Sequence, residues 1–342
     1  MKRVIFARDF EIAASDEQPH TNTQTRSHDN ERGNCFSRAI MKDISARSYP
    51  AAMHPNVQSA ATRAITFLPR YLDSPLHTPS IAAFAAAAEW LDAADPQQCA
   101  EIILDSGCGT GRSTRMLARR NPDAVVIGVD RSESRLESSD PLPSNALLVR
   151  AELASFWRLL IAAEAEDGIL AASRIQQHFL LYPNPYPKAS RLNLRWHGHA
   201  ALPILLAIGE QLEVRSNWRV YLDEFGEAAA TVARAAAAET ATHDDGARSS
   251  APVSAAALSS WQYAARRASL RLGSAMRSEG AGTQEGHMVS ELHVASEEEA
   301  LTAFERRYYL TGEPLYRLVL RSRSPVRVLR PRDGRASSSA DS

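Results

Sequence analysis

An acid followed by three glycines at alternate positions is the most chemically suggestive pattern in the chain. The residues are Asp105, Gly107, Gly109 and Gly111, and they come directly after an apolar stretch. Glycine has no Cβ, so the chain can turn sharply there and a ligand can approach the backbone. A second apolar run ends on Asp130, 19 residues past Gly111, where a carboxylate can accept hydrogen bonds from ribose hydroxyls. This order of strand, glycine turn, helix, strand and acid predicts a nucleoside pocket in a doubly wound sheet.

The spacing of the glycines distinguishes two kinds of cofactor. A dinucleotide-binding turn has the pattern Gly-x-Gly-x-x-Gly, with the amides of a helix N-terminus facing a pyrophosphate. Here Asp105 precedes the glycines. Its carboxylate would repel a phosphate but suits the ammonium group of an amino acid. S-adenosylmethionine has such an ammonium group and no phosphate, so we expect it, and not NAD, as the cofactor.

Composition and length limit the class of protein. The chain has 342 residues, 44% of them hydrophobic, and a net charge of −1, so we expect a full core and no overall attraction to polyanions. Three cysteines, Cys35, Cys99 and Cys108, are too few for a disulfide framework and lack metal-ligand spacing. No apolar run of about 18 residues indicates a membrane span, and the N-terminus lacks the apolar region of a signal peptide. We therefore expect a cytoplasmic protein without a metal or a membrane anchor, and a monomer by default.

The pattern along the chain indicates one α/β domain with appendages. Residues 1–50 are polar and aperiodic and are expected to be disordered, like the tail at 331–342. The domain is expected over 51–330, with a low-complexity insertion around 242–290. Apolar runs predict strands at 146–149, 178–182, 211–215 and 315–320, and helices are predicted at 81–91, 228–241, 261–272 and from Ser296.

Residues 182–188, Tyr-Pro-Asn-Pro-Tyr-Pro-Lys, directly follow the core of the strand predicted at 178–182. Three prolines fix φ and lack amide donors, so this segment is expected to be a rigid extended loop. Ligands of open α/β sheets bind at the carboxyl ends of the strands. The position favours a loop that faces the methyl donor, and the alternative is a stiff connector.

At this loop the chain resembles the tRNA guanine-N7 methyltransferase family, whose loop reads Phe-Pro-Asp-Pro-Trp-Pro-Lys. Two further segments are similar to the family: 216–221, where the family has Thr-Asp-Trp-x-x-Tyr, and 302–305, where it has Thr-x-Phe-Glu. The resemblance covers roughly 81–225 and 296–321. It implies a Rossmann-like class I S-adenosylmethionine-dependent methyltransferase, with helices on both faces of a mostly parallel seven-stranded sheet. It also implies tRNA, or another structured RNA, as the partner.

The resemblance implies roles for individual residues. The cofactor would contact Asp105, Asp130 and Glu152, together with the three glycines. The target guanosine would be surrounded by Asn184, Tyr186, Lys188, Asn217, Thr302 and Glu305, with Asn184 and Glu305 as the catalytic pair.

The chain departs from the family at the two acids that face the substrate, which are Asn184 and Asn217 here. Guanine N7 already offers a lone pair, so methyl transfer needs no base, and an asparagine carbonyl can accept from guanine N–H groups. Glu305 would then supply the negative charge that favours a cationic product. Two alternatives stay open: a methyltransferase for a small molecule or a protein, and an RNA-binding relative without turnover.

Two local clusters allow more than one interpretation. Nine arginines lie between residues 306 and 335 against Glu313 and Asp333, an excess of +7. This stripe would bind RNA phosphates or be a solvated edge.

His197 and His199 have half of a metal-site pattern, but no third ligand has suitable spacing, which favours a structural role.

Overall fold

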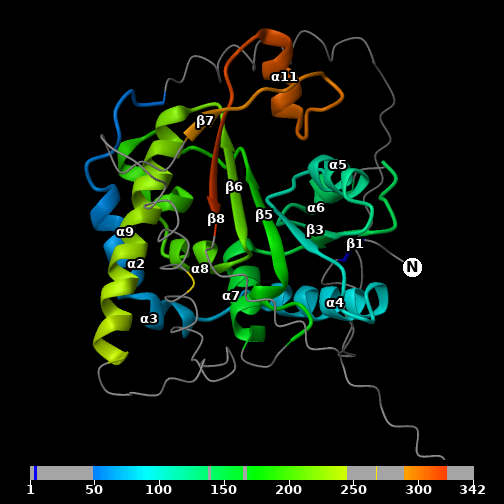
Figure 1. The fold of residues 1–342 in the computed structure, drawn as a ribbon, viewed down its shortest axis with the longest axis horizontal. Helices are drawn as coiled ribbons and strands as arrows, with labels where there is room; N and C mark the ends of the chain where they lie inside the picture. The colour runs from blue at the N-terminus through cyan, green and yellow to red at the C-terminus, as the bar shows by residue number, and fades with distance from the viewer. Residues whose placement is uncertain are drawn as a thin grey trace, which may run out of the picture.

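The structure, a computed structural model, describes residues 4–5, 49–137, 140–164, 168–244, 267 and 289–321. Its centre is an eight-stranded sheet with the order β1-β4-β3-β2-β5-β6-β8-β7 (Figure 1). The strands are β1 (Val4–Ile5), β2 (Ile102–Ser106), β3 (Val125–Asp130), β4 (Ala146–Arg150), β5 (Ile175–Leu181), β6 (Gln211–Ser216), β7 (Val289–Glu291) and β8 (Tyr316–Arg321). Neighbouring strands are parallel, except that β8 runs antiparallel to β6 and β7.

Strands β2 to β8 confirm the predicted Rossmann-like class I arrangement, a mostly parallel seven-stranded sheet. The apolar runs predicted as strands at 146–149, 178–182, 211–215 and 315–320 correspond to β4, β5, β6 and β8. The edge strands β1 and β7 were not predicted, and β7 begins inside the segment assigned to the low-complexity insertion around 242–290. Val4 pairs with Leu148 and Ile5 with Val149, inside a segment that the sequence assigned to a disordered extension. Two residues are too short a run to show an alternating pattern.

The helices and turns that connect the strands are α2 (Val57–Thr66), α3 (Leu68–Leu72), α4 (Thr78–Ala94), α5 (Arg112–Arg120), α6 (Glu133–Leu136), α7 (Leu153–Glu164), α8 (Leu202–Ala207), α9 (Arg219–Asp244) and α11 (Ala303–Thr311), with short 3₁₀ helices η2 (Ala172–Arg174), η3 (Ala189–Leu194) and η4 (Trp196–Gly198). The helices predicted at 81–91 and 228–241 lie inside α4 and α9. The helix predicted at 261–272 lies outside the described residues, apart from residue 267.

The helix predicted from Ser296 begins later than expected, at Ala303. Its N-cap is Thr302, whose side-chain oxygen accepts a hydrogen bond from the Glu305 amide at 3.1 Å. A threonine N-cap satisfies one of the free amides of the first turn, which the acids at 297–299 do not. The acids instead lie in a turn before the helix.

The strands bury both of their faces. On β2, Ile102 and Leu104 belong to the larger hydrophobic core, whereas Ile103 between them belongs to a second core on the other face. The larger core also contains residues of α2, α4, α7, α8 and α9, and the second contains Leu117 of α5. This alternation follows from the two-residue period of a strand and confirms that helices cover both faces.

The sheet reverses its order between β2 and β5. From β2 the chain builds β3 and β4 on one side, and then returns to place β5 and β6 on the other. In register, Ser106 pairs with Leu180 and with Val129. The glycine turn after Ser106 and the proline loop after Leu181 therefore lie at the same edge, at a topological switch point where ligands of such sheets bind.

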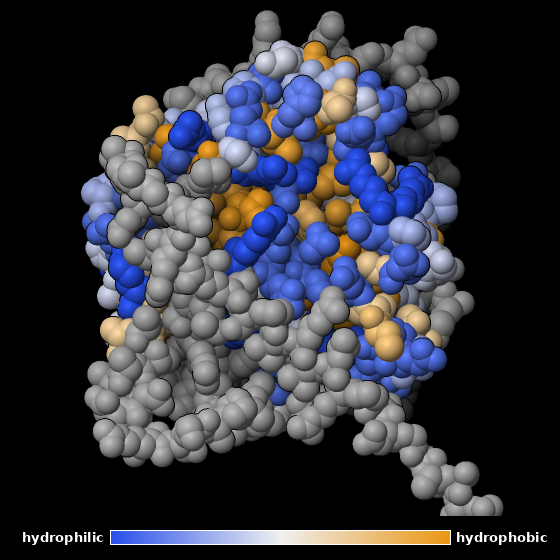
Figure 2. Space-filling view, in the orientation of Figure 1, coloured by the Kyte–Doolittle hydropathy of each residue, from blue (hydrophilic) through white to orange (hydrophobic). Residues whose placement is uncertain are grey.

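The outer surface is largely hydrophilic on the face shown in Figure 2, where the described hydrophobic residues form small patches between polar ones. Within the described ranges, no helix is both long enough and apolar enough to cross a membrane.

A buried carboxylate, Glu224 on α9, connects distant parts of the chain. It is fully buried and accepts three hydrogen bonds, from the Tyr49 hydroxyl at 2.5 Å, the His54 amide at 2.8 Å and Arg195 Nη1 at 2.7 Å, and its Oε2 atom also lies 2.9 Å from His197 Nε2. Burial by itself would raise the pKa of the Glu224 carboxyl, but the interactions with His197 and Tyr49 outweigh it and lower the pKa to about 2. We call these five residues the Glu224 cluster.

We predict that Glu224→Gln destabilises the fold by about 3–5 kcal/mol at pH 7, because it leaves the buried Arg195 guanidinium without its counter-charge. The folded pKa of about 2 lies below the ordinary value of 4.5. The stabilisation by Glu224 is therefore complete above pH 4.5 and is lost as the pH falls from 4.5 towards 2. Urea unfolding of both proteins at several pH values measures this difference.

The matched control is Glu227→Gln, one turn further along α9. Glu227 accepts a hydrogen bond from Gln58 at 2.8 Å and lies 3.4 Å from exposed Arg234, so its loss is expected to cost less than about 1 kcal/mol. Equal losses for the two variants, or a difference that does not shrink in acid, would contradict a stabilising role for the Glu224 cluster.

Candidate active site

The glycine turn lies between the ends of β2 and β3. The amides of Gly107 and Cys108 donate to the Val129 carbonyl at 2.8 and 3.2 Å, which ties the turn to β3. Gly111 has φ of 75°, and a Cβ there would lie 2.8 Å from the side chain of Leu148. A larger residue at this position would therefore be strained and would also clash. Above Gly107 the space is open, since a Cβ there would meet only Leu153, at 3.9 Å.

Asp105 is fully buried beneath this turn. Its Oδ2 atom accepts hydrogen bonds from the Ser113 and Thr114 hydroxyls of α5 at 2.6 and 2.7 Å. Its Oδ1 atom is buried and has no hydrogen-bond partner among the described residues. Burial raises the pKa of Asp105 to about 6, the two hydroxyls oppose the rise, and Asp130 adds to it. A buried carboxylate oxygen without a donor fits the ammonium group of a bound amino acid.

Asp130 lies at the tip of β3, where the sequence predicted it. Its Oδ2 atom accepts from the Gly109 amide at 3.0 Å, and its Oδ1 atom accepts from the Ser132 amide at 2.8 Å. Arg135, which is half exposed, forms an ion pair with Oδ1 at 2.9 Å. The carboxylate is thus next to the glycine turn, and a ribose would have to share it with Arg135.

Glu152 lies one strand further along the same edge, after β4. Its two carboxylate oxygens accept hydrogen bonds from the amides of Ala154 and Ser155 at 3.0 and 2.6 Å. It therefore caps the N-terminus of α7, a role that the sequence analysis did not assign. Glu152 therefore lies at the edge where the sequence analysis expected a cofactor contact. If adenine binds there, it meets a carboxylate that already accepts hydrogen bonds from two amides.

The proline loop, residues 182–188, leaves the end of β5 in an extended path. The Tyr182 amide donates to the Arg215 carbonyl at 2.9 Å, and the Tyr182 ring stacks on Phe304 at 5.8 Å. Tyr186 has φ of 41°, and its amide donates to Asn184 Oδ1 at 3.2 Å. Positive φ is unfavourable for a residue with a side chain, so this turn must be held by its surroundings.

Arg195 binds the backbone of the proline loop through hydrogen bonds. Its Nε atom donates to the Tyr186 carbonyl at 3.1 Å and its Nη2 atom to the Pro187 carbonyl at 3.4 Å. Its Nη1 atom bonds Glu224, and the guanidinium lies 4.9 Å from the centre of the Tyr49 ring. The side chain is 1% exposed. The loop is therefore attached to the Glu224 cluster through one guanidinium.

Glu305 lies beside the proline loop but is fully buried. Its Oε1 atom pairs with Arg215 Nη1 at 2.8 Å, and its Oε2 atom accepts from the Leu301 amide at 2.6 Å. Arg215 pairs also with Glu213, at 2.7 Å. Burial and the Glu305 charge raise the pKa of the Tyr182 hydroxyl. The sequence analysis gave Glu305 an unpaired charge facing the substrate, whereas the structure pairs that charge with Arg215.

The remaining predicted residues lie at the same edge. Asn184 and Lys188 are exposed on the proline loop, and Asn217 is half-buried in the turn between β6 and α9. Thr302 caps α11, whose Phe304 reaches Tyr182. The fold thus brings the segments 182–188, 216–221 and 302–305 together, although more than 80 residues separate the last two.

Four residues that hold the site together were not predicted as site residues. Ser113 and Thr114 hold Asp105, and their only signal is their position in the first turn of the helix after the glycines. Arg215 pairs with Glu305, and Arg195 holds the proline loop. These pairings depend on residues distant in sequence, so no local pattern reveals them.

The histidines near the loop have structural roles. His197 Nε2 lies 2.9 Å from Glu224 Oε2, and burial lowers the pKa of its imidazole although Glu224 raises it. His199 accepts a hydrogen bond from the Ala201 amide at 3.1 Å and packs edge-on against Trp196. In the part of the chain that the structure describes, no group of three or more His, Cys, Asp or Glu residues is arranged to hold a metal ion.

Comparison with known proteins identifies the central segment. A family model for a methyltransferase domain matches residues 103–181. Trans-aconitate 2-methyltransferase of Pseudomonas aeruginosa (strain PAO1) is 44% identical over 92 residues, which are 27% of this chain and 31% of that protein. The enzyme of the same name from Yersinia pestis (strain Pestoides F) is 38% identical over 87 residues, 25% of this chain and 32% of that protein. The chain thus spans about a third of the length of the curated relatives it matches.

Solved structures show only distant similarity. The aminoglycoside resistance methyltransferase NpmB1 is 17% identical, with a TM-score of 0.34 over 69% of this chain and 93% of that chain. A 16S rRNA (adenine(1408)-N(1))-methyltransferase from Catenulisporales acidiphilia is 15% identical, with a TM-score of 0.32 over 72% and 93%. Similarity at this level does not indicate a substrate.

The matched segment contains the glycine turn, Asp105 and Asp130, and it ends at the last residue of β5. The strand order, the buried acid and the open space above Gly107 agree with the same assignment. Residues 103–181 match a methyltransferase domain and lie in a Rossmann-like class I fold, and the cofactor is S-adenosylmethionine.

Proposed function

We propose that this protein transfers a methyl group from S-adenosylmethionine to guanine N7 of a structured RNA, with tRNA as the first candidate. The observation that carries the proposal is the proline loop. It leaves β5 beside the strand of Asp105, exposes Asn184 and Lys188, and is held in place by the buried Arg195. A rigid polar loop next to the methyl donor is suited to hold a methyl acceptor.

The chemistry of the acceptor edge supports a neutral nucleophile. Guanine N7 attacks with its own lone pair, so no group needs to remove a proton. Glu305, a carboxylate beside Tyr182 of the loop, is paired with Arg215 and is not a free base. Catalysis would then consist mainly of holding N7 in line with the methyl group at near-attack distance.

Each proposed acceptor residue has a role that its geometry allows. Asn184 and Asn217 would hydrogen-bond the edge of the base through their amides, Tyr186 would stack on it, and Lys188 would attract the neighbouring phosphate. Thr302 and Glu305 would act through α11. Thr302 caps this helix, and the ion pair between Glu305 and Arg215 fixes it next to Tyr182, which makes Glu305 a positioning residue in this proposal.

A second candidate is methyl transfer to a small carboxylic acid, as the name of the trans-aconitate relatives suggests. Asn184, Asn217 and Glu305 lie outside the family match, which ends at residue 181, so this similarity concerns mainly the cofactor half. A polycarboxylate would need several cations at the acceptor edge, where Arg215 is already paired with two acids and the exposed Lys188 is the cation of the proline loop. An RNA-binding protein without turnover is the third candidate.

We predict that the purified protein transfers labelled methyl groups into bulk tRNA and that nucleoside analysis finds 7-methylguanosine. Asn184→Ala should lower kcat about tenfold, the effect of about one lost hydrogen bond, with unchanged affinity for S-adenosylmethionine. The control, Asp123→Ala, changes an exposed residue at the opposite edge of the sheet and should have no effect. Transfer of the label to trans-aconitate and not to tRNA would favour the second candidate. Binding of S-adenosylmethionine without transfer of the label to either would favour the third.

We also predict that the affinity for S-adenosylmethionine depends on pH through Asp105. The ammonium group needs an ionised carboxylate, and the pKa of Asp105 is about 6. Affinity should therefore be constant between about pH 6.5 and 7 and fall roughly tenfold per pH unit below 6. Calorimetry between pH 5 and 7 measures this slope.

Asp105→Asn is the control for that experiment. It should bind weakly at every pH and show no slope, because the amide does not titrate in this range. A wild-type affinity that stays constant from pH 5 to 7 would contradict contact between Asp105 and the ammonium group.

A further inference from the structure

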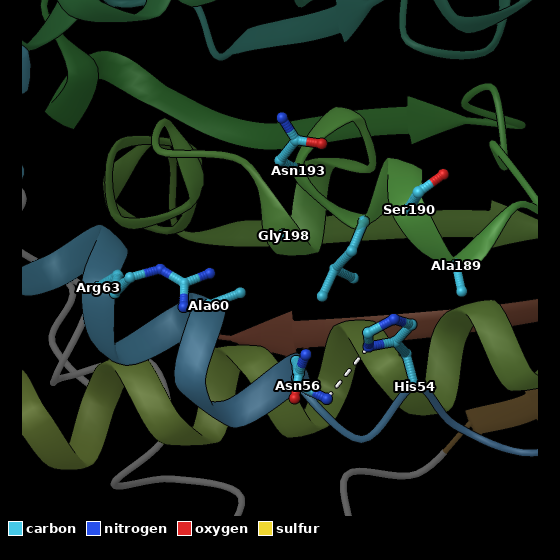
Figure 3. Close-up of a pocket in the computed structure, with 9 residues that line it drawn as sticks. His54, Asn56, Ala60, Arg63, Ala189, Ser190, Asn193 and Gly198 are labelled. Atoms are coloured by element: carbon cyan, nitrogen blue, oxygen red, sulfur yellow. Dashed lines mark hydrogen bonds between the residues drawn. The ribbon is translucent and has the colours of Figure 1, made fainter.

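We propose that a groove between α2 and the η3–η4 segment binds a second nucleotide of the substrate RNA, next to the one that receives the methyl group. This inference rests on the proposed function and assigns the RNA a second contact. In Figure 3, Ala60 and Arg63 project from α2, and Ala189, Ser190 and Asn193 come from the facing segment.

The groove has the size and chemistry of a ligand site. Its volume is about 410 Å³, within the roughly 300–1,000 Å³ typical of small-ligand pockets. Its polar lining consists of His54, Asn56, Arg63, Ser190 and Asn193. These side chains provide a guanidinium, an imidazole, two amides and a hydroxyl, which is a set able to bind both a base edge and a phosphate.

The charge of the groove favours an anionic ligand. No lining residue is an acid, and Arg63 is a cation that can bind phosphate in a bidentate manner. His54 Nδ1 accepts a hydrogen bond from the Asn56 amide at 3.1 Å, which leaves Nε2 as the donor of the neutral ring. Exposed Lys188 and Arg191 flank Ala189 and Ser190 in the chain. Phosphodiester is the ligand chemistry that matches these donors.

The two walls of the groove are held together by the Glu224 cluster. Glu224 Oε1 binds the His54 amide of one wall, and Oε2 binds Arg195 and His197 of the other. In the second wall Gly198 packs so closely that a Cβ would lie 2.2 Å from the Leu192 carbonyl oxygen. The groove is therefore preformed, and a ligand would bind without the cost of ordering its walls.

The groove continues from the acceptor edge. Arg195 bonds the carbonyls of Tyr186 and Pro187, and the chain then passes Lys188 and lines the groove with Ala189 and Ser190. Only two residues separate Tyr186, the proposed stacking partner of the target base, from the groove wall. A ligand that occupies both places must be a connected chain with a base-sized unit and an anionic link, which is what an RNA strand provides.

The test compares Arg63→Ala/Asn193→Ala with Arg70→Ala in the full-length protein. Arg63 and Asn193 are exposed groove residues, so their replacement should not affect folding, and Arg70 is an exposed arginine on α3 that does not line the groove. The measurements are KM and kcat for tRNA methylation at several salt concentrations, and the Kd of S-adenosylmethionine.

We expect the double variant to raise KM for tRNA about tenfold, with unchanged kcat and cofactor Kd. The slope of the logarithm of RNA affinity against the logarithm of salt concentration should become shallower by about 0.7–0.9, the effect of one lost phosphate contact. Arg70→Ala should behave like the wild type. If the wild type methylates RNA and the double variant equals Arg70→Ala, the groove inference is overturned while the proposed function stands. If the wild type methylates only a small acid, the proposed function fails first and the RNA assignment of the groove fails with it.

Discussion

The buried negative charge of Glu224 is the constraint on which the acceptor side of this protein depends. A carboxylate without exposure to water is costly unless polar partners surround it, and here the partners are Tyr49, His54, Arg195 and His197. They come from two separate parts of the chain, and Glu224 itself comes from a third. Satisfying one charge therefore fixes the segment before α2, the η3–η4 segment and α9 against each other. Through Arg195 the same charge holds the proline loop at the carboxyl end of β5.

The two sides of the candidate active site differ in whether their charged side chains are paired. On the proposed cofactor side, Asp105 keeps one buried oxygen without a donor, and burial raises its pKa to about 6. On the proposed acceptor side, Glu305 and Arg215 neutralise each other, and Asn184 is uncharged. In the proposed function, Asp105 would attract the ammonium group of S-adenosylmethionine. The acceptor would be recognised by hydrogen bonds and stacking.

The similarity to known proteins follows the same division. The methyltransferase family match ends at residue 181, and the proline loop begins at residue 182. The match therefore covers the segment proposed to bind the cofactor and stops before the segment proposed to bind the methyl acceptor. The acceptor half depends on contacts of this chain, chiefly those of Arg195 and Arg215, and the groove beside α2 lies in that half.

The sequence by itself determined strands β2 to β6 and β8, the glycine turn and the positions of Asp105 and Asp130, because each depends on neighbours a few residues away. Alternating apolar residues specify a strand, and glycine permits the turn wherever the chain folds. Only the tertiary structure decided that Glu152 caps α7, that Arg215 pairs with Glu305 and that α11 begins after Thr302 rather than at Ser296. The partners of Glu224 could not be predicted from nearby residues either, since Tyr49 is 175 residues away from it in the chain. Which donor reaches a buried charge is fixed by packing of the whole chain, and no local pattern in the sequence records it.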